Sequence, residues 1–373
     1  MAMIATQSTP VLHLLDALLC GGAERLAVEL AIRTSVERFS PALACFRQEA
    51  FADELAAAGR PVHVVPKRRA FDLGLLLALR RLLRREHVAV VHAHDLQSAT
   101  YGLMAGRLAR AAVVLTVHGL GIFRQARSAR LLPFLARRAD RMVFVGHWLE
   151  RFAIEEFGLR PRHPVVVHNG VDVGAFCPGA PDPVLRDELG IPADARVVGT
   201  VGNLRAVKDY PCLVRAFAAA RARVPDAALV FVGDGEERPR LEALARELDV
   251  ADAVCFAGAR TDVPRLLRLF DVFALSSQTE GISVALLEAM ATGLPAAVTD
   301  TGGNPEVVER GRTGLLAPVG DSEQLGAALA DLLADPNRCA AFGSAARERV
   351  EQEFSLGRMV REYESLYDAV GRR

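Results

Sequence analysis

Short apolar runs alternate with helix-forming stretches along almost the whole chain, and this alternation limits the possible folds more than any other feature. Strands that alternate with helices form parallel sheets joined by right-handed crossovers. The sequence therefore predicts an α/β protein. The expected strands lie at residues 11–18, 41–46, 61–66, 88–93, 112–117, 141–145 and 164–168, and then at 197–203, 228–233, 253–257, 272–276 and 296–299.

The expected strands fall into two groups, and a chain of 373 residues is long enough for two domains. Each group predicts a Rossmann-like domain, in which ligands bind at the carboxyl ends of the strands. A Pro- and Gly-rich stretch at residues 177–183 suggests a hinge between the groups. We therefore expect one domain at residues 1–176 and a second at residues 177–355, followed by an amphipathic last segment.

Composition and the first residues bear on where the protein works. No run of 18 or more apolar residues is present, so no membrane-spanning helix is expected. The start of the chain lacks the charged and apolar regions of a secretory signal. Six cysteines are scattered without a CxxC pair, which favours reduced thiols over disulfides or a zinc site. These features predict a cytoplasmic protein.

The net charge of zero conceals an asymmetry between the two halves. Residues 1–172 contain 23 basic and 15 acidic residues, whereas residues 173–373 contain 22 and 30. The basic first half suggests contact with anionic lipid headgroups, to which each basic residue contributes about 1 kcal/mol. The alternative is a set of solvated helix faces and attraction between two oppositely charged domains. Nucleic acid is not expected as a partner, because the basic stretches lack interleaved aromatic residues.

Lysine is rare in this chain, where Lys67 and Lys208 are the only two lysines among 45 basic residues. Lysine differs from arginine in offering a compact ammonium group on a flexible stem. In a chain so rich in arginine, we expect each lysine to lie where that compact charge is needed.

One block of the second half places two carboxylates around the start of a predicted helix. Glu280 lies just before the helix, Ser283 is a good N-cap, and Glu288 follows inside it. Gly293 and Pro295 end the helix. Helix N-termini attract anions such as phosphate, and carboxylates bind hydroxyl groups. The combination suits a sugar joined to a nucleoside through a diphosphate.

This block resembles the E-x7-E region of the family 4 retaining glycosyltransferases, which move a sugar from a nucleotide donor. The resemblance covers almost the whole chain, is tightest over residues 197–318, and includes EAMATGLP and TGGNPEVV. It implies the GT-B fold, with two Rossmann-like domains whose parallel sheets face each other across a cleft. It also implies that the last helix, residues 356–373, packs back on the first domain.

The resemblance also implies roles for individual residues of this block. Glu280 is expected to hold hydroxyls of the transferred sugar near its anomeric carbon, and Glu288 to bind the ribose hydroxyls. The nucleobase is expected against residues 258–260, which end in Arg260. The backbone amides expected to bind the sugar or the phosphates are those of Gly281, Ile282 and Ser283.

Two cations follow the first strand of the second half, at Arg205 and Lys208. At the carboxyl end of a sheet they would offset the charge that develops on a departing diphosphate. In the family, an Arg and a Lys grip the diphosphate together. Lys208 matches that Lys, but Asn203 occupies the position of the Arg, so Arg205 is expected to substitute for it.

Two features of the first half match the family as well. The GGAE loop would bring the amides of Gly22 and Ala23 to the diphosphate, although paired glycines alone indicate only a tight turn. His118 follows a strand, and the resemblance gives it a contact with the donor sugar near the reacting carbon. The alternative role for His118 is to stabilise its own loop through a backbone hydrogen bond.

The motif HAHD raises the question of a metal. His92 and His94 share one face of a strand, but no third ligand is evident, so a structural or acceptor-side role is favoured, for Asp95 too. No Asp-x-Asp motif, which holds a divalent cation in the other large glycosyltransferase fold, occurs in the chain. We therefore expect no metal cofactor.

The sequence thus predicts a retaining glycosyltransferase that uses a UDP- or GDP-sugar and a glycan or lipid-linked acceptor in bacterial envelope polysaccharide or glycolipid synthesis. Its acceptor loops are expected at residues 68–74 and 120–130. Two alternatives stay open: a sugar-nucleotide epimerase or hydrolase of the same fold, and a non-catalytic sugar-nucleotide-binding subunit, which Asn203 favours. A nicotinamide dehydrogenase is disfavoured, because the GxGxxG fingerprint is missing.

Overall fold

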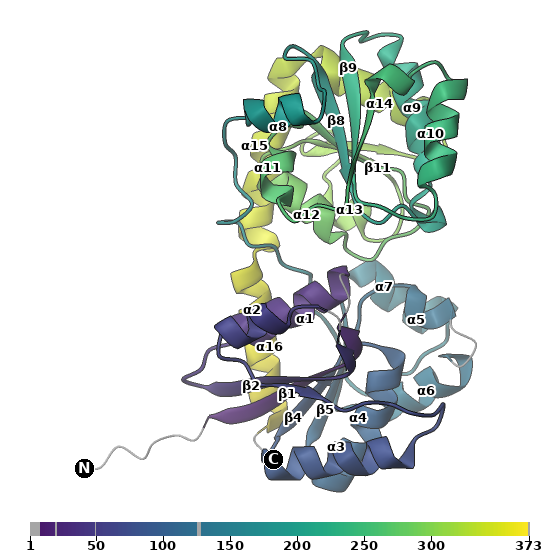
Figure 1. The fold of residues 1–373 in the computed structure, drawn as a ribbon. Coiled ribbons are helices and arrows are strands. Elements are labelled where there is room, and N and C mark those ends of the chain that lie inside the picture. Colours follow the sequence, from purple (N-terminus) through teal and green to yellow (C-terminus); the bar gives the residue numbers. More distant parts are fainter. Residues whose placement is uncertain (1–7, 19–20, 49, 125–127, 372–373) are drawn as a thin grey trace. The chain divides into compact units, whose positions relative to one another are not determined.

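The chain forms two compact units in a computed structural model that describes residues 8–18, 21–48, 50–124 and 128–371 (Figure 1). Unit 1 comprises Met1–Asn169 and Gly357–Arg373, and unit 2 comprises Gly170–Leu356. Each unit is built on one parallel sheet with helices on both faces, which confirms the predicted fold class.

Unit 1 contains a seven-stranded sheet in the order β3-β2-β1-β4-β5-β6-β7. Alternate side chains of its strands point to opposite faces, as the pleat requires. Leu12 and Leu14 pack towards α3 (Leu73–Arg85) and α4 (Leu96–Ala109), whereas Leu15 packs towards α1 (Gly22–Arg33). The strands are β1 (Thr9–Leu18), β2 (Phe39–Gln48), β3 (Val62–Val64), β4 (Val90–Ala93), β5 (Ala112–Val117), β6 (Arg141–Phe144) and β7 (Pro164–Val166).

The helices of unit 1 follow the predicted crossovers. Two of them have side-chain N-caps, because Asp72 accepts from the Leu75 amide before α3 and Asp95 caps α4. The helices are α1 (Gly22–Arg33), α2 (Ala52–Ala57), α3 (Leu73–Arg85), α4 (Leu96–Ala109), α5 (Gly121–Arg124), α6 (Ser128–Arg138), α7 (His147–Arg151), the π-helix η1 (Phe152–Glu156) and the last helix α16 (Leu356–Gly371).

Unit 2 contains a six-stranded sheet in the order β10-β9-β8-β11-β12-β13. Five of its strands are predicted from the sequence, and β13 is not, because its residues, GLLA, include no β-branched or aromatic side chain. The strands are β8 (Arg196–Val201), β9 (Ala227–Val232), β10 (Val254–Gly258), β11 (Val272–Leu275), β12 (Ala296–Thr299) and β13 (Gly314–Ala317).

The helices of unit 2 also cover both faces of their sheet. One apolar core joins the sheet to α11, α12 and α15, and a second joins it to α9, α10 and α14. The helices are α8 (Pro183–Glu188), η2 (Ala206–Lys208), α9 (Tyr210–Arg221), α10 (Arg238–Glu247), η3 (Ala251–Ala253), α11 (Val263–Leu267), α12 (Val284–Ala291), α13 (Asn304–Val307), α14 (Ser322–Ala334) and α15 (Pro336–Glu353).

The chain passes from unit 1 to unit 2 between Asn169 and Gly170, earlier than the predicted boundary at residues 176 and 177. Val171 donates to the Phe354 carbonyl at 2.9 Å and accepts from the Leu356 amide at 2.8 Å. Arg268 donates to the Cys177 carbonyl at 3.1 Å. The Pro- and Gly-rich stretch at residues 177–183 therefore lies inside unit 2 and is not the crossing point.

The strand order reverses once in each sheet. In unit 1 the reversal lies between β1 and β4, and in unit 2 it lies between β8 and β11. Loops that leave two such strands diverge to opposite faces, which opens a crevice at the carboxyl edge where ligands bind in this class of fold. Lys208 and Glu280 follow β8 and β11, the two strands at the reversal of unit 2, whereas His118 follows β5 and Arg260 follows the edge strand β10. No helix within the described ranges is both long and apolar enough to cross a membrane.

Candidate active site

In unit 2 the loops after β8 and β11 bring two predicted site residues into direct contact. The Lys208 ammonium donates to Glu280 Oε1 at 2.6 Å, and the Ser277 hydroxyl donates to the same oxygen at 2.6 Å. Both ionic side chains are partly buried. An ammonium and a carboxylate therefore lie together at the reversal point of the sheet, where the sequence predicts the diphosphate and the sugar.

The loop that carries Glu280 is held by the loop after β12. Gly303 donates to the Gly281 carbonyl at 3.0 Å, and Thr299 Oγ1 donates to the Ser277 carbonyl at 2.7 Å. Gly302 adopts a φ of 56°, and a Cβ atom there would lie 2.0 Å from the Glu280 carbonyl oxygen. Glycine at 302 is therefore required for the two loops to approach, which gives a physical reason for the TGG sequence.

Helix α12 begins where the sequence predicts. The Ser283 side chain caps it by accepting from the Leu286 amide at 3.4 Å. Glu288 lies on the second turn and is partly buried. Gly281 and Ile282 lie between Glu280 and the cap, so that the backbone of these residues passes beside the carboxylate. The donor contacts assigned to these residues stay predictions.

The other predicted donor residues of unit 2 differ in how their side chains are engaged. Arg205 and Asn203 are both exposed in the loop after β8. Arg260, in contrast, donates to Asp262 at 2.8 and 2.9 Å and to Glu188 at 2.6 Å. These carboxylates raise the pKa of the Arg260 guanidinium and occupy it. Contact of this loop with a ligand would therefore involve its backbone.

In unit 1 the strand register places four histidines on one face of the sheet. His13 on β1 pairs with His92 on β4, and His92 pairs with Val114 on β5. Because side chains alternate, His94 and His118 lie on the same face as His92. That face is covered by α16, where Tyr367 contacts His92 at 2.7 Å.

The imidazoles are joined in a row. His118 Nε2 lies 3.1 Å from His94 Nδ1, and His94 Nε2 lies 3.2 Å from His13 Nδ1. Burial lowers the pKa of His13 to about 3 and that of His118 to about 4, and it lowers the pKa of His94 well below its usual value. All are therefore neutral at pH 7.

Neutrality couples the tautomers of the row. A neutral imidazole donates from one ring nitrogen and accepts at the other, so both hydrogen bonds of the row run in one direction. Within the described part of the chain, His118 Nδ1 has no hydrogen-bond partner. Whether this nitrogen presents a proton or a lone pair therefore follows from the tautomer of His94.

The expectation that HAHD has no third partner of the metal-ligand type is wrong. His13 joins His92 and His94, with ring nitrogens within 4.8 Å of one another. The signal in the sequence was a histidine in the middle of an apolar strand. Both ring nitrogens of His92 are hydrogen-bonded, to Tyr367 and to Thr116 at 2.7 Å each, so a metal would have to replace one of these bonds.

The carboxyl edge of the unit 1 sheet also holds a small polar hollow of about 220 Å³. Helix α1 begins beside it at Gly22, and residues 19–20 of the preceding loop lie outside the described residues. Asp95 accepts from the Asp16 amide at 2.7 Å, and burial raises the pKa of Asp95. The residues that line this hollow are Leu15, Asp16, Ala17, Ala23, Glu24, Arg47, His94, Asp95, Leu96 and Gln97.

Both halves of the chain match known sequence families. Residues 20–175 match Glycosyltransferase Family 4, and residues 182–349 match Glycosyl transferases group 1. The chain is 31% identical to the N-acetyl-alpha-D-glucosaminyl L-malate synthase of Bacillus anthracis over 80% of its own length and 79% of that protein.

Two other relatives are named for lipid acceptors. The Escherichia coli UDP-Gal:alpha-D-GlcNAc-diphosphoundecaprenol alpha-1,3-galactosyltransferase is 29% identical, over 79% of each chain. The GDP-mannose-dependent alpha-(1-6)-phosphatidylinositol monomannoside mannosyltransferase of Mycolicibacterium smegmatis is 34% identical, over 68% of this chain and 72% of that protein.

The fold has close counterparts among solved structures. Anabaena Alr3699/HepE in complex with UDP-glucose matches with a TM-score of 0.85 at 24% identity, covering 96% of this chain and 99% of that one. The sequence matches, together with this shared GT-B architecture, show that the chain belongs to the group 1 glycosyltransferases of family 4.

Proposed function

We propose that this glycosyltransferase is a retaining, metal-independent enzyme that transfers a sugar from a UDP- or GDP-sugar to a lipid-linked or glycan acceptor in envelope polysaccharide or glycolipid synthesis. The observation that carries the proposal is the Lys208–Glu280 pair at the reversal point of the unit 2 sheet. The Lys208 ammonium can bind a diphosphate, and the Glu280 carboxylate can bind sugar hydroxyls. The two groups are hydrogen-bonded to each other.

The chemistry follows from these two charges. The bond between the anomeric carbon and the diphosphate oxygen breaks, and negative charge grows on the departing diphosphate. The Lys208 ammonium stabilises that charge, which lowers the barrier because the cation is already in place. The acceptor hydroxyl attacks the anomeric carbon on the same face, and its proton passes to the leaving phosphate oxygen.

Glu280 serves a different part of the donor. Its Oε1 accepts from both Lys208 and Ser277, which fixes the carboxylate in one orientation and leaves Oε2 for a sugar hydroxyl. Its backbone is held by the loop of Gly302 and Gly303. A carboxylate held by two hydrogen bonds, on a loop that is itself hydrogen-bonded at Gly281, is suited to hold a sugar at a defined distance from the diphosphate.

The test is nucleotide release from UDP-, GDP- and ADP-sugars in the presence of EDTA, with and without candidate acceptors. Release from one donor, lost in Glu280→Gln but kept in the exposed control Glu247→Gln, would support the proposal. Release that requires added Mg²⁺ or Mn²⁺ would contradict metal independence. Tight binding of UDP or GDP with no release under any condition would favour the non-catalytic binding subunit.

We further propose that unit 1 rests on an anionic membrane surface. The outer side of α3 exposes Leu73 and Leu77 and continues into Arg81 and Arg84. A helix with exposed apolar and cationic residues binds the interface of anionic bilayers. Cosedimentation with phosphatidylglycerol vesicles but not with phosphatidylcholine vesicles, weakened in the double variant Arg81→Gln/Arg84→Gln, would support this. Equal binding to both vesicles, or none, would contradict it.

A further inference from the structure

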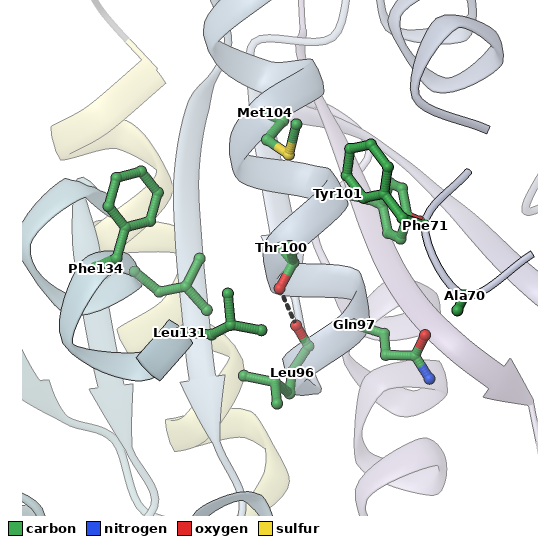
Figure 2. Close-up of a pocket in the computed structure, with 10 residues that line it drawn as sticks. Ala70, Phe71, Leu96, Gln97, Thr100, Tyr101, Met104, Leu131 and Phe134 are labelled. Carbon is green, nitrogen blue, oxygen red and sulfur yellow. Dashed lines mark hydrogen bonds between the residues drawn. The ribbon is translucent and has the colours of Figure 1, made fainter. Parts of the chain in front are cut away.

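Unit 1 contains an apolar cavity of about 650 Å³ between α4, α6 and the loop before α3 (Figure 2). This volume lies within the range of about 300–1,000 Å³ that is typical of small-molecule sites. Tyr101 and Met104 of α4 face Phe71 of the loop, and Leu131 and Phe134 of α6 lie on the opposite side (Figure 2). The lining also includes Ala70, Leu96, Gln97, Thr100 and Leu135.

The rim of the cavity exposes large apolar side chains. Phe71 is 61% exposed and Phe134 is 51% exposed, whereas Tyr101 inside is 4% exposed. The Tyr101 hydroxyl accepts from the Asp72 amide at 2.8 Å and so anchors the loop that carries Phe71. Two solvent-exposed phenylalanines on either side of an apolar cavity indicate a surface that binds an apolar ligand.

A cation lies beside two residues that line this cavity, Gln97 and Tyr101. The Lys67 ammonium donates to the Gln97 side-chain oxygen and lies 5.7 Å from the centre of the Tyr101 ring. Arg68 and Arg69 follow it and are exposed, and none of these three residues forms an ion pair within the described ranges. One of the two lysines of the chain therefore lies beside the lining of an apolar cavity, with its charge available to an anion.

The cavity also meets the polar hollow at the carboxyl edge of the sheet. Leu96 and Gln97, on the first turn of α4, line both. The hollow continues to Asp16, Asp95 and His94. The apolar cavity, the Lys67 ammonium and the hydrogen-bonding groups of the hollow therefore meet at Gln97. A phosphate-linked glycolipid has the matching parts in this order: a hydrocarbon chain, a phosphate and a sugar.

We propose that this cavity binds the hydrocarbon chain of a prenyl phosphate or prenyl diphosphate, the lipid part of the acceptor, with Lys67 at its phosphate and the acceptor sugar in the polar hollow. The inference rests on the proposed function and narrows its acceptor to a single-chain lipid. One continuous cavity accommodates one chain, whereas a diacyl lipid would leave its second chain outside. The aromatic and thioether lining adapts to a branched chain, since methionine fills irregular space.

In the first experiment, the full-length protein is titrated with farnesyl phosphate and binding is measured by calorimetry. We expect saturable binding that is weakened about tenfold or more by Thr100→Phe, which fills the cavity. Phe134→Ser, at the exposed rim, should weaken binding by a smaller factor and cannot disrupt the core. Leu108→Ser is the control for both variants. Leu108 lies on α4, the helix of Thr100, and is 50% exposed like Phe134, but it does not line the cavity.

Two further ligands separate the parts of the proposal. Farnesol, which lacks the phosphate, should bind more weakly than farnesyl phosphate, and Lys67→Met should reduce this difference. Dioctanoyl phosphatidylglycerol should bind less well than farnesyl phosphate. Absence of saturable farnesyl phosphate binding, equal binding in Thr100→Phe, or preference for the diacyl lipid would each overturn the proposal.

Titration of the same protein with UDP and GDP keeps the two proposals distinguishable. Nucleotide binding without farnesyl phosphate binding would refute the lipid site and leave the proposed function intact. Farnesyl phosphate binding without binding of either nucleotide would support the cavity as a lipid site and count against the donor assignment.

Discussion

The reversal points of the two sheets have the same topology and opposite chemistry. In unit 2, charged groups meet there, since the Lys208 ammonium contacts the Glu280 carboxylate. In unit 1, the row from His118 through His94 to His13 is buried and neutral. A parallel sheet thus fixes where a site lies, and the strand ends and loops decide which chemistry it offers.

The comparison suggests a division of work. In unit 2, the Lys208 ammonium suits a diphosphate, because the negative charge of a diphosphate is stabilised by a cation. The neutral histidine row of unit 1 offers hydrogen bonds to hydroxyl groups and carries no charge of its own, although Asp16, Arg47 and Asp95 line the hollow beside it. Four experiments test this contrast between the two units.

The largest effect should be an acid sensitivity confined to unit 1. The pKa of His13 falls from 6.5 to about 3 on folding, so protonation below pH 6.5 favours the unfolded state. The stabilisation is complete above pH 6.5 and is lost as the pH falls towards 3. At about 1.4 kcal/mol per pH unit, His13 alone should cost about 2 kcal/mol between pH 6.5 and 5.

Urea unfolding followed by tryptophan fluorescence measures this effect in unit 1, because Trp148, the single tryptophan, lies in α7. His13→Leu should reduce the loss between pH 6.5 and 5, and the exposed control His163→Gln should not. If the free energy of unfolding were the same at pH 7 and pH 5, the row would not be neutral in the folded protein.

Removal of the cation at the charged point should give the next largest effect. Lys208→Ala should raise the Kd for UDP or GDP about 100-fold, since hydrogen bonds from a charged group contribute about 1.5–3 kcal/mol. Calorimetric titration measures the change, with the exposed Arg246→Gln as control. Unchanged nucleotide affinity would remove Lys208 from the diphosphate site.

Glu288 should matter less, because it is expected to bind ribose hydroxyls and not the charged diphosphate. Glu288→Ala should raise the nucleotide Kd about tenfold, which corresponds to about 1.4 kcal/mol. The control is Glu247→Gln, on the exposed side of α10. A deoxyribose nucleotide that lost affinity equally in the wild type and in Glu288→Ala would show that another residue binds the ribose.

The smallest effect concerns Arg205, which is exposed in the loop after β8. Exposed charge pairs contribute about 0.2–1 kcal/mol, so Arg205→Gln should weaken nucleotide binding by about fivefold at most. Asn203→Arg, which restores the cation of the family pattern, should recover the affinity in the double variant. A loss as large as that of Lys208→Ala would make Arg205 an equal partner in binding the diphosphate.

Local sequence patterns were enough to predict the strand–helix alternation and the helix at Val284–Ala291 with its Ser283 cap. These features depend on neighbours within a few residues, so propensity and periodicity reveal them. Strand β13 was not predicted because its residues, GLLA, include no β-branched or aromatic side chain that would favour a strand.

Other features depend on residues far apart in the chain. His13 was overlooked because only the register between β1 and β4 places it beside His92. The crossing at Asn169 lies before the expected boundary because Val171 bonds to residues 354 and 356, nearly 200 positions later. Arg260 was assigned to the donor, and its guanidinium is occupied by Asp262 and Glu188.

Local periodicity and one continuous motif were enough to predict the class of fold, the family and the residues around the unit 2 reversal point. Only the folded structure shows that Lys208 and Glu280 touch, that His118, His94 and His13 form a neutral row, and that Lys67 contacts a residue of the cavity lining. Contacts of this kind depend on strand register and helix packing, which join side chains that no local pattern relates.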